Sequence, residues 1–397
     1  MADYMDDDTL PMKRLRLRLE EEISAGARIK VIGIGGGGSN AVNRMIEAGV
    51  TGVDFIQVNT DAQQLQYAAA PNKVHIGDKL TKGRGAGGNP EIGMKAAQES
   101  SDRLLELLEG ADMIFITAGM GGGTGTGASP IIAQLAHETH ALVVGIVTQP
   151  FGFEGARRRA IAEEGSTALR EYVDALITIP NDRLLQLIEP TTPMLEAFRL
   201  ADDVLRQGIQ GITELVTKPG VINLDFNDVK SVMRGQGTAL MAIGYATGPD
   251  RAVAAAHAAI ESPLLEASID GATGILFNLV AGPNLTMYEV QQAADVIHKI
   301  VDPDASIFAG AAIDPSLGDD IRITLIATGF ENGRRQLIRP VPTGTAAYDS
   351  GTTGPITWQP ASPREAVLRP IQRTGNRLAV NGEVPSFLRG PQKRANP

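Results

Sequence analysis

The sequence predicts an α/β protein with a mostly parallel sheet, a long central helix and a second, smaller α/β region. Three observations predict this fold. Short apolar runs of strand length alternate with stretches of helix length up to Ile179, and two of these runs lead into glycine-rich loops. After Pro193, apolar residues recur at three- and four-residue steps over a long stretch. Strands that alternate with helices favour parallel pairing, because each connecting helix covers one face of the sheet.

The strands expected in the first region are residues 29–34, 53–58, 113–117, 142–147 and 175–179. Helical spacing begins at Asn40 after the first strand, and the polar turn Asn59-Thr60-Asp61 follows the second. The long helix is expected to start near Pro193, whose fixed φ suits a first-turn position, and to stop at Pro219-Gly220. A rise of about 1.5 Å per residue makes this helix about 35 Å long, enough to run along a whole domain.

Further strands are expected after the long helix at residues 274–280, 306–309 and 321–327, alternating with helices at 253–260 and 288–300. Beyond Asn332, Pro, Gly, Thr, Gln and Arg dominate without apolar periodicity, which predicts a disordered linker. The expected organisation is a flexible segment (1–28), a first domain (29–192), a central helix (193–219), a second domain (220–332), the linker (333–381) and a terminal peptide (382–397).

Composition excludes several classes of protein. The 397 residues include no Cys, which removes disulfides, thiol nucleophiles and Cys-based zinc sites, and the five His are scattered, so no metal site is predicted. A net charge of −10 and scarce aromatic residues argue against nucleic-acid binding. No apolar run approaches the roughly 20 residues that a membrane span needs, so we expect a cytoplasmic protein without direct membrane insertion.

Charge is unevenly distributed along the chain. From Glu331 to the end there are ten Lys and Arg against four Asp and Glu, a net of +6, which leaves −16 on the first 330 residues. A basic tail on an acidic body indicates an interaction segment. Near its end, Val384-Pro-Ser-Phe-Leu-Arg389 forms a small apolar island, which composition alone gives no reason to call functional.

The first glycine-rich loop, Gly33 to Asn40, lies between the first strand and the first helix. Glycines let the backbone approach a phosphate closely, and a helix N-terminus supplies free N–H groups and a partial positive charge. Gly33, Gly35 and Gly38 also satisfy G-x-G-x-x-G, a pattern that fits a nicotinamide-dependent Rossmann oxidoreductase equally well. This loop alone therefore does not identify the ligand.

A second glycine-rich loop distinguishes these possibilities. Ala118-Gly-Met-Gly-Gly-Gly-Thr-Gly-Thr-Gly127 follows another strand and leads into a helix expected at Pro130. Two such loops at two strand-to-helix junctions can wrap a polyphosphate from both sides with backbone amides, whereas dehydrogenases have no use for the second loop. The motif G-x-x-x-x-G-K-[ST] is absent, so the chain is not a P-loop enzyme. Tight turns alone do not easily explain so many Gly and Thr in one loop.

The segment Gly121 to Gly127, GGGTGTG, resembles the signature loop of the tubulin/FtsZ superfamily. The resemblance continues in order through residues 148–155, 179–182, 198–204 and 223–228, and covers roughly residues 29–330. Eukaryotic tubulins are longer and match less well, so the bacterial FtsZ branch is indicated. The resemblance implies a Rossmann-like GTP-binding domain, the tubulin/FtsZ fold, and a GTPase that self-assembles into the cell-division ring.

Carried over position by position, the resemblance implies a site for GTP or GDP, with Mg²⁺ accompanying the nucleotide. Glu154 and Arg158 would contact the ribose and neighbouring groups, although their spacing alone predicts a surface ion pair. Asn181 and Asp202 would read the guanine, because a carboxylate accepts from its N1–H and 2-amino group; the adjacent Asp203 is the alternative to Asp202. The remaining nucleotide contacts would come from Gly36, Gly37, Gly38, Ser39, Asn40, Gly121, Gly122, Gly123, Thr124, Gly125, Thr126 and Phe198.

Asn223, Asp225 and Asp228 fall in the segment that follows the long helix. From the residues alone, Asp225 is most simply a helix cap ahead of Val229 and Met233. The resemblance instead implies that this segment is catalytic and inserts into the nucleotide pocket of a neighbouring subunit. There the two carboxylates would orient and polarise the attacking water, in a reaction dominated by positioning and electrostatics.

The resemblance also implies partners and a location. The chain would form a head-to-tail homopolymer, and the peptide 382–397, which contains Pro385-Ser-Phe-Leu-Arg389, would dock on membrane-anchoring division proteins. It would act in the cytoplasm, at the division site on the inner face of the membrane. The alternatives are an NAD-dependent oxidoreductase, which the second glycine loop argues against, and a non-hydrolysing filament paralogue, which intact Asp225 and Asp228 argue against.

Overall fold

The computed structural model describes residues 26–217, 220–222, 224–265 and 267–330. Over these residues, ten strands form one sheet in the order β3-β2-β1-β4-β5-β6-β7-β10-β8-β9. Pairing is parallel from β3 through to β7 and again between β8 and β9, while β10 is antiparallel to both its neighbours. The prediction of a mostly parallel α/β sheet is confirmed.

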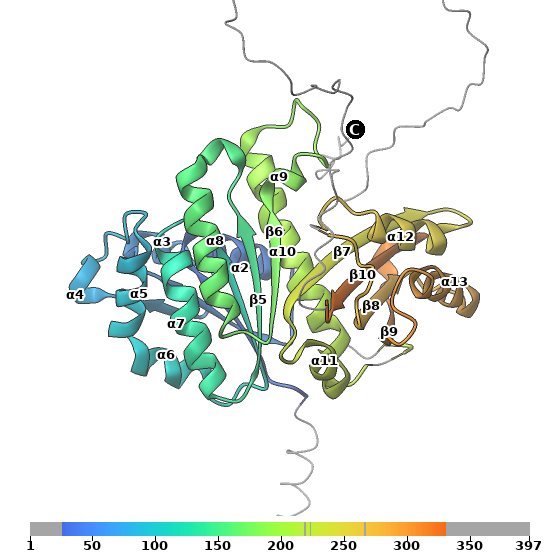
Figure 1. Ribbon diagram of the computed structural model, residues 1–397, viewed down its shortest axis with the longest axis horizontal. Helices are drawn as coiled ribbons and strands as arrows, with labels where there is room; N and C mark the ends of the chain where they lie inside the picture. Colours follow the sequence, from blue (N-terminus) through green and yellow to red (C-terminus); the bar gives the residue numbers. More distant parts are fainter. Residues whose placement is uncertain (1–25, 218–219, 223, 266, 331–397) are drawn as a thin grey trace, which may run out of the picture. The chain divides into compact units, whose positions relative to one another are not determined.

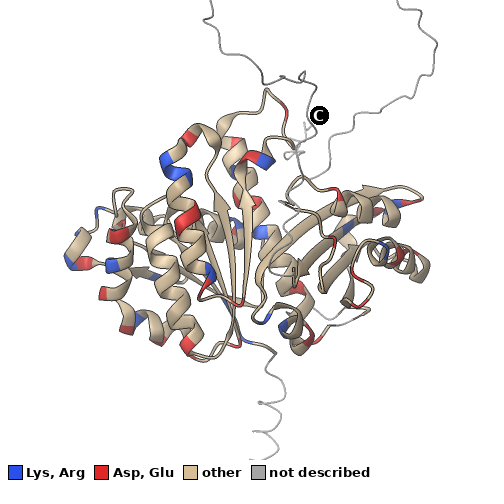
Figure 2. Ribbon diagram, viewed as in Figure 1, with Lys and Arg blue, Asp and Glu red and all other residues tan. Residues whose placement is uncertain are grey.

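The central parallel strands are apolar along their whole length, because helices cover both faces of the sheet. Figure 2 shows these strands almost free of charged residues, which lie instead on the surrounding helices and loops. The strands of this half are β1 (Ile29–Ile34), β2 (Val53–Asn59), β3 (Asn72–His75), β4 (Met113–Gly119), β5 (Leu142–Gln149) and β6 (Ala175–Pro180).

Successive side chains of each strand enter two different cores. Val31 packs on one face with Met45 and Ile209, whereas Ile32 packs on the other face with Ile132. The first face is covered by α2 (Gly35–Glu47) and α10 (Met194–Thr217). The second face is covered by α5 (Pro90–Glu99), α6 (Ser101–Leu108), α7 (Thr124–Glu138) and α8 (Ala156–Arg170), and Figure 1 shows α7 and α8 in front of the sheet.

The second half of the sheet has its own apolar cluster, in which Ala255 and Ile297 from two helices pack against Phe277 and Leu325 from the strands. Short connecting elements include α3 (Ala62–Gln66), α4 (Asp78–Thr81), η1 (Gly152–Glu154), α9 (Asn181–Leu184) and η2 (Pro315–Leu317). The elements of this half are α11 (Phe226–Met233), β7 (Gly237–Thr247), α12 (Arg251–Ile260), β8 (Gly274–Ala281), α13 (Met287–His298), β9 (Ser306–Ile313) and β10 (Asp320–Thr328).

Several boundaries differ from the sequence prediction. α2 and α7 start inside the glycine loops, at Gly35 and Thr124, rather than at Asn40 and Pro130. Tertiary packing outweighs the low helix propensity of Gly there, and Pro130 is tolerated inside α7 although it removes one helical hydrogen bond. The prediction also misses β3, which is short, and β7, whose Ala and Gly residues are poor strand formers.

The long helix was predicted well, since α10 begins one residue after Pro193. Its predicted end at Pro219-Gly220 falls partly outside the described residues, as do the segment 1–25, the linker 333–381 and the terminal peptide 382–397. Among the residues that are described, none of the helices is both long and apolar enough to cross a membrane.

Candidate functional site

The two glycine-rich loops meet at the carboxyl edge of the parallel strands. Gly35 has a φ of +69°, and a β-carbon added there would lie 2.9 Å from the backbone nitrogen of Gly125. A side chain at Gly35 would therefore force the loops apart. In neither α2 nor α7 does a side chain cap the first turn, so backbone N–H groups of both helices face the same edge, an arrangement suited to phosphate.

Hydroxyl groups hold the second loop in shape. The N–H of Gly121, whose φ is +97°, donates to Thr126 Oγ1 at 2.9 Å. Thr124 Oγ1 lies 2.7 Å from the hydroxyl of Thr60, which follows β2. Gly122 and Gly123 complete the turn into α7. The structure therefore adds Thr60 to the site, and its position at the end of a predicted parallel strand could have indicated this.

The predicted phosphate-binding residues of the first loop, Gly36 to Asn40, form the start of α2. A β-carbon added at Gly36 would lie 3.2 Å from Gln64 Oε1, and Gly37 similarly approaches the backbone of Gly119. Asn40 is exposed, whereas Ser39 is buried and its Oγ has no hydrogen-bond partner among the described residues. These positions lie together at the edge where the sequence placed them.

The predicted base-reading residues come from the residue that follows β6 and from the first half of α10. Asn181 starts α9 directly after β6 and is buried, and its Oδ1 has no partner among the described residues. Asp202 lies just over two turns into α10, half-buried. Burial raises the pKa of Asp202 to about 7, against the opposing field of Arg44 on α2 and with a smaller increase from Asp203. Sequence analysis did not single out Arg44.

Unlike Asp202, Asp203 is hydrogen-bonded to other side chains of α10. Its Oδ1 accepts from Arg206 Nε at 2.6 Å and its Oδ2 accepts from Gln207 Nε2 at 2.5 Å. Asp202 has no hydrogen bond or ion pair with any described residue. Both oxygens of Asp203 therefore already accept hydrogen bonds within the helix, whereas those of Asp202 do not.

An aromatic cluster joins α10 to the turn after β5. Phe198 packs edge-on against Phe151, with ring centroids 5.3 Å apart, and Phe153 stacks on Phe151. In the same turn, Glu154 accepts from the N–H of Phe151 and pairs with Arg158 four residues later. The Glu154–Arg158 pair thus forms within the chain itself, as their spacing predicts.

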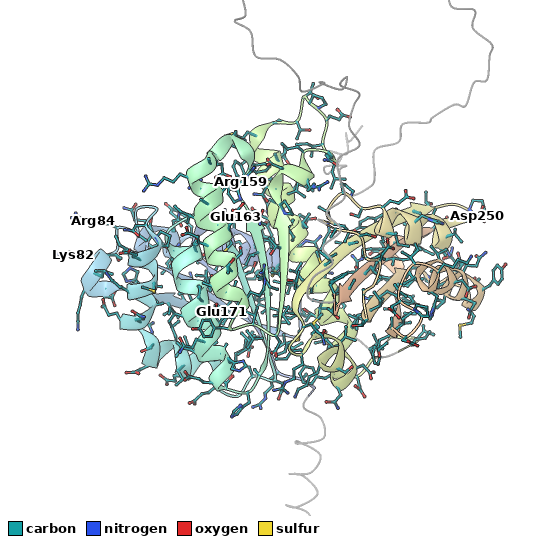
Figure 3. The ribbon with its side chains drawn as sticks, in the orientation of Figure 1. Lys82, Arg84, Arg159, Glu163, Glu171 and Asp250 are labelled. Carbon is teal, nitrogen blue, oxygen red and sulfur yellow. The ribbon has the colours of Figure 1, made fainter. Side chains whose placement is uncertain are left out.

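A second contact fixes this turn beside the end of β6. Asp182 Oδ1 accepts from the N–H of Gly152 at 2.7 Å, and its other oxygen pairs with Arg159 at 2.7 Å. Figure 3 shows Arg159 near the upper end of α8 and Glu171 just past its lower end. The turn with Glu154 and the first turn of α8 with Arg158 are therefore held beside Asn181, which precedes Asp182 at the same edge.

Asp225 and Asp228 lie elsewhere. They form a capping box at the start of α11: Asp228 N donates to Asp225 Oδ1 at 2.8 Å, and Asp225 N donates to Asp228 Oδ2 at 3.1 Å. Just beyond α11, the N–H of Gly235 donates to Asp174, the residue that precedes β6. α11 therefore lies at the amino edge of the parallel strands, and Figure 1 shows α9 and α11 towards opposite ends of α10. Asn223 lies outside the described residues.

No cluster of three or more His, Cys, Asp or Glu side chains suited to a metal ion occurs in the part of the chain that the structure describes. The candidate site contains backbone amides, hydroxyls and the side-chain amide of Asn181 at one edge of the sheet, together with the carboxyl groups of Asp202 and Glu154. Such a donor set suits a nucleotide with its phosphates.

Comparison with known proteins agrees with this geometry. Residues 28–189 match the model of the tubulin/FtsZ family GTPase domain, and residues 237–331 match the model of the FtsZ family C-terminal domain. The chain is 42% identical to a structure described as an FtsZ dimer from M. jannaschii, covering 81% of this chain and 93% of that one with a TM-score of 0.75. These matches do not favour an oxidoreductase.

More distant structures share the fold. CetZ2 and CetZ1 from Haloferax volcanii are 21% and 20% identical, with TM-scores of 0.66 and 0.67, and each aligns over 78% of this chain and over 95% and 96% of its own length. Guanine-nucleotide binding, GTP hydrolysis and a GTP-dependent cytoskeletal role follow from the FtsZ matches. The chain belongs to the FtsZ branch of the tubulin/FtsZ family of GTPases.

Proposed function

We propose that this GTPase assembles head to tail and hydrolyses GTP only where two subunits meet. The observation that carries the proposal is the separation of the two halves of the site. The glycine loops lie at the carboxyl edge of the parallel strands, whereas the Asp225–Asp228 capping box precedes α11 at the amino edge.

The length of α10 supports this proposal. Its 24 residues span about 36 Å, and the capping box follows its far end. A group that positions water must come within hydrogen-bond reach of the reacting atoms. Asp225 and Asp228 therefore serve a second copy, whose carboxyl edge faces the amino edge of the first. Such a head-to-tail contact repeats without closing and builds an open filament.

Different residues of the chain would bind the phosphates, the ribose and the base of the nucleotide. The amides of Gly36, Gly37, Gly38 and the loop Gly121–Thr126 suit the phosphates, and Asp202 suits the two N–H donors of guanine. The unpaired buried atoms Ser39 Oγ and Asn181 Oδ1 give further polar contacts. The likeness of Asn40, Phe198, Glu154 and Arg158 to family positions supports roles around the base and ribose. Mg²⁺ bound to the phosphates would neutralise part of their charge.

The capping box is compatible with a catalytic role for both carboxylates. One oxygen of each accepts from the other residue's backbone N–H, which fixes both side chains and leaves a second oxygen on each. Fixed carboxylates can accept hydrogen bonds from a water and orient it for attack on the γ-phosphate. Asn223 would complete this segment.

In the cell, we infer that the filament forms the division ring in the cytoplasm, on the inner face of the membrane. The basic tail and its terminal peptide 382–397 would bind membrane-anchoring division proteins, because no described helix could anchor the chain by itself. This role rests on the likeness of Pro385-Ser-Phe-Leu-Arg389 to the family's tail peptide.

The concentration dependence of GTP turnover tests the proposal. Phosphate release and sedimentation are measured in parallel over a dilution series, with GTP, GDP and NAD. We expect turnover per subunit to fall steeply below the concentration at which GTP-dependent filaments sediment, and no response to NAD. Turnover per subunit that stays constant down to dilutions without filaments would place the whole active site within one chain.

A further inference from the structure

Thr60 connects the end of β2 to the second glycine loop. Its hydroxyl lies 2.7 Å from that of Thr124, the first residue of α7. Both side chains are enclosed, with exposed fractions of 0% for Thr60 and 9% for Thr124. Because the two hydroxyls are hydrogen-bonded to each other, the placement of Thr60 bears on where the Thr124 hydroxyl lies.

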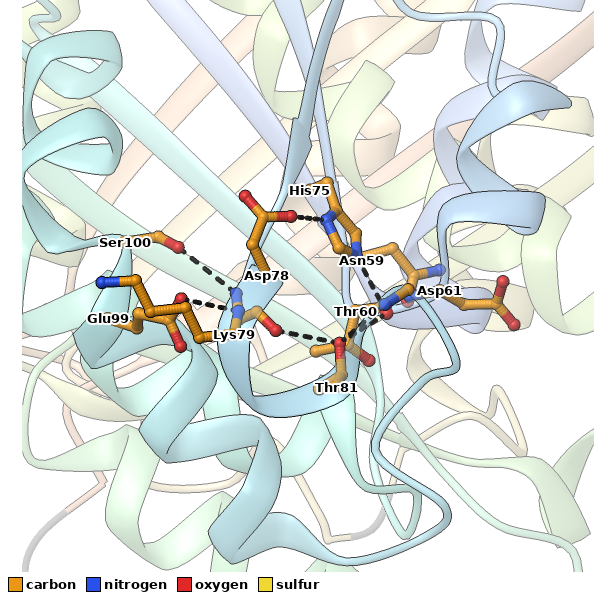
Figure 4. A network of polar contacts seen from close by, with 11 residues as sticks. Asn59, Thr60, Asp61, His75, Asp78, Lys79, Thr81, Glu99 and Ser100 are labelled. Carbon is orange, nitrogen blue, oxygen red and sulfur yellow. Dashed lines mark hydrogen bonds and ion pairs between the residues drawn. The ribbon is translucent and has the colours of Figure 1, made fainter.

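The carbonyl oxygen of Thr60 is held from three sides. It accepts from Thr81 Oγ1 at 3.2 Å, from the N–H of Gly85 at 3.1 Å and from His75 Nε2 at 3.1 Å. These donors come from the end of α4, the loop after it, and the end of β3. Figure 4 shows His75 and Thr81 both directed at this residue.

The other ring nitrogen of His75 contacts Asp78 Oδ1, as Figure 4 also shows. Both partners of the ring are therefore acceptors, a carboxylate on one side and a carbonyl on the other. A carbonyl oxygen can only accept, so the contact with Thr60 needs the proton on Nε2 of His75. The side chain of Asp78 is 69% exposed and that of His75 is 20% exposed. His75 therefore connects a surface carboxylate to the buried Thr60.

A purely structural explanation is that His75 and Asp78 only steady the short helix α4, which Asp78 begins. Thr81 already performs that task, since its hydroxyl also bonds the carbonyl of Gly77 at 3.0 Å. His75 is instead the donor that ties β3 to Thr60, and through Thr60 to the phosphate loop. The chain of contacts thus leads into the site rather than away from it.

We propose that His75, oriented by Asp78, is a positioning residue of the GTPase, which holds Thr60 so that Thr124 is correctly placed against the nucleotide phosphates. The inference rests on the proposed role of Thr124. It predicts that removing the His75 donor impairs the reaction through Thr60, and by no other route.

A double-mutant cycle on the full-length chain tests this. His75→Phe keeps a ring and removes both nitrogens, Thr60→Val removes the hydroxyl at constant shape, and the double variant combines them. Above the assembly concentration, we expect His75→Phe to lower kcat for GTP by about 3- to 10-fold with a smaller change in KM. The double variant should turn over no more slowly than Thr60→Val alone, because one path carries both effects. His75→Gln, which retains an amide donor, should recover most of the loss.

Controls separate this inference from the assignment of the site. His137→Phe, the same change at an exposed position on α7, should leave kcat and Tm unchanged. Losses that multiply in the double variant, or a lower Tm for His75→Phe with unchanged kcat and KM, would overturn the positioning role. Thr124→Ala with normal kcat and KM would instead show that Thr124 does not serve the phosphates, a failure of the proposed function itself.

Discussion

Asp202 and Asp203 are adjacent in α10, yet only Asp203 is engaged by its own helix. Arg206 and Gln207 hold both oxygens of Asp203, whereas Asp202 makes no hydrogen bond or ion pair with the described residues, and burial raises its pKa to about 7. A carboxyl group that is enclosed but unpaired is a typical ligand-reading group. This difference favours Asp202 as the guanine-reading residue, a choice that the sequence left open.

The first prediction concerns nucleotide choice. Asp202→Ala should weaken GTP and GDP binding by about 1–3 kcal/mol, because buried hydrogen bonds to the base are lost. Asp203→Ala, the matched neighbour, should affect Tm more than affinity, since its contacts lie within the helix. Titration of each variant with GDP and ATP analogues measures both effects. Equal ATP and GTP affinity in the unmutated protein would contradict the assignment.

The second prediction concerns pH. Both oxygens of Asp202 can accept from the two N–H donors of guanine only when the carboxyl group is ionised, and binding should therefore release a proton near neutral pH. With a pKa of about 7, roughly a tenth of the carboxyl groups are ionised at pH 6, so GDP affinity should fall about tenfold between pH 8 and pH 6. Asp202→Asn is the control. Its carboxyl group is gone, so any pH dependence that remains comes from the phosphate of the nucleotide. An identical pH profile in that variant would show that Asp202 plays no part.

The raised pKa of Asp202 also makes the folding stability of the nucleotide-free protein depend on pH. The pKa of Asp202 is higher in the folded state than its ordinary 3.8, so the stability it contributes is complete below that value and is lost as pH rises through about 7. In the absence of nucleotide, Asp202→Asn should therefore raise Tm relative to the unmutated protein, and by more at pH 8 than at pH 6. Thermal melts at the two pH values measure this.

A third prediction concerns the second half of the sheet. Glu289, in the first turn of α13, pairs with Arg251 of α12 at 2.6 Å, and that hydrogen bond, together with those from Thr286, lowers the pKa of Glu289 to about 2 despite burial. Its stabilisation is present above its ordinary 4.5 and is lost as pH falls towards about 2. Removing one partner of such a buried pair should cost about 3–5 kcal/mol. Acid unfolding of Glu289→Gln should lack this component, and an unchanged acid transition would contradict it.

The sequence was sufficient to predict most of the parallel strands, the helix α10 and the edge of the sheet at which the glycine loops meet. Apolar runs such as β4 and β5 are unambiguous, and a glycine loop after a parallel strand has only one edge at which to lie. It was insufficient for β7, whose Ala and Gly residues become a strand only through pairing with β10. Thr60 was missed because its role depends on a contact with Thr124, and Arg44 was missed because its charge acts on Asp202; both partners are far away in the chain.

The Asp225 segment shows a different limit. Capping and catalysis appeared as alternatives in the sequence, and the structure contains the capping box. A cap uses one oxygen of each carboxylate, so the two explanations are not exclusive. Whether the second oxygens act on a neighbouring nucleotide depends on a second subunit, which no pattern within one chain can specify.

The fourth prediction concerns the tail. A chain ending at Asn381 should still polymerise and hydrolyse GTP at the normal rate, because the two family-matched regions end by residue 331. In cells it should fail to form a membrane-attached ring, since it lacks the terminal peptide that we propose binds membrane-anchoring proteins. Light microscopy of a strain without a full-length copy measures this. Normal mid-cell rings from the truncated chain would refute the tail assignment.

The last prediction tests the shared active site by mixing two inactive variants. Asp228→Asn keeps an oxygen that can accept from Asp225 N, so the capping box and α11 should survive, but the charge is lost. This variant should bind GTP and assemble, with turnover reduced by at least about tenfold, as for loss of one transition-state contact. Thr124→Asp places a negative charge in the phosphate loop and should bind no GTP, while its Asp225–Asp228 box remains intact. Circular dichroism confirms that both variants fold.

Mixed together, the two variants should regain activity, because an Asp228→Asn pocket filled with GTP can meet an intact acidic box from a Thr124→Asp subunit. Turnover should peak at an intermediate mixing ratio, above the low residual rate of Asp228→Asn alone and the absent turnover of Thr124→Asp alone. Subunits without nucleotide join filaments less readily, so the peak should lie below the unmutated rate. A matched mixture of Asp228→Asn with a Thr124→Asp, Asp228→Asn double variant should stay inactive, since neither chain then supplies the box. Recovery in that control, or none in the first mixture despite co-sedimentation of both chains, would exclude a site shared between subunits.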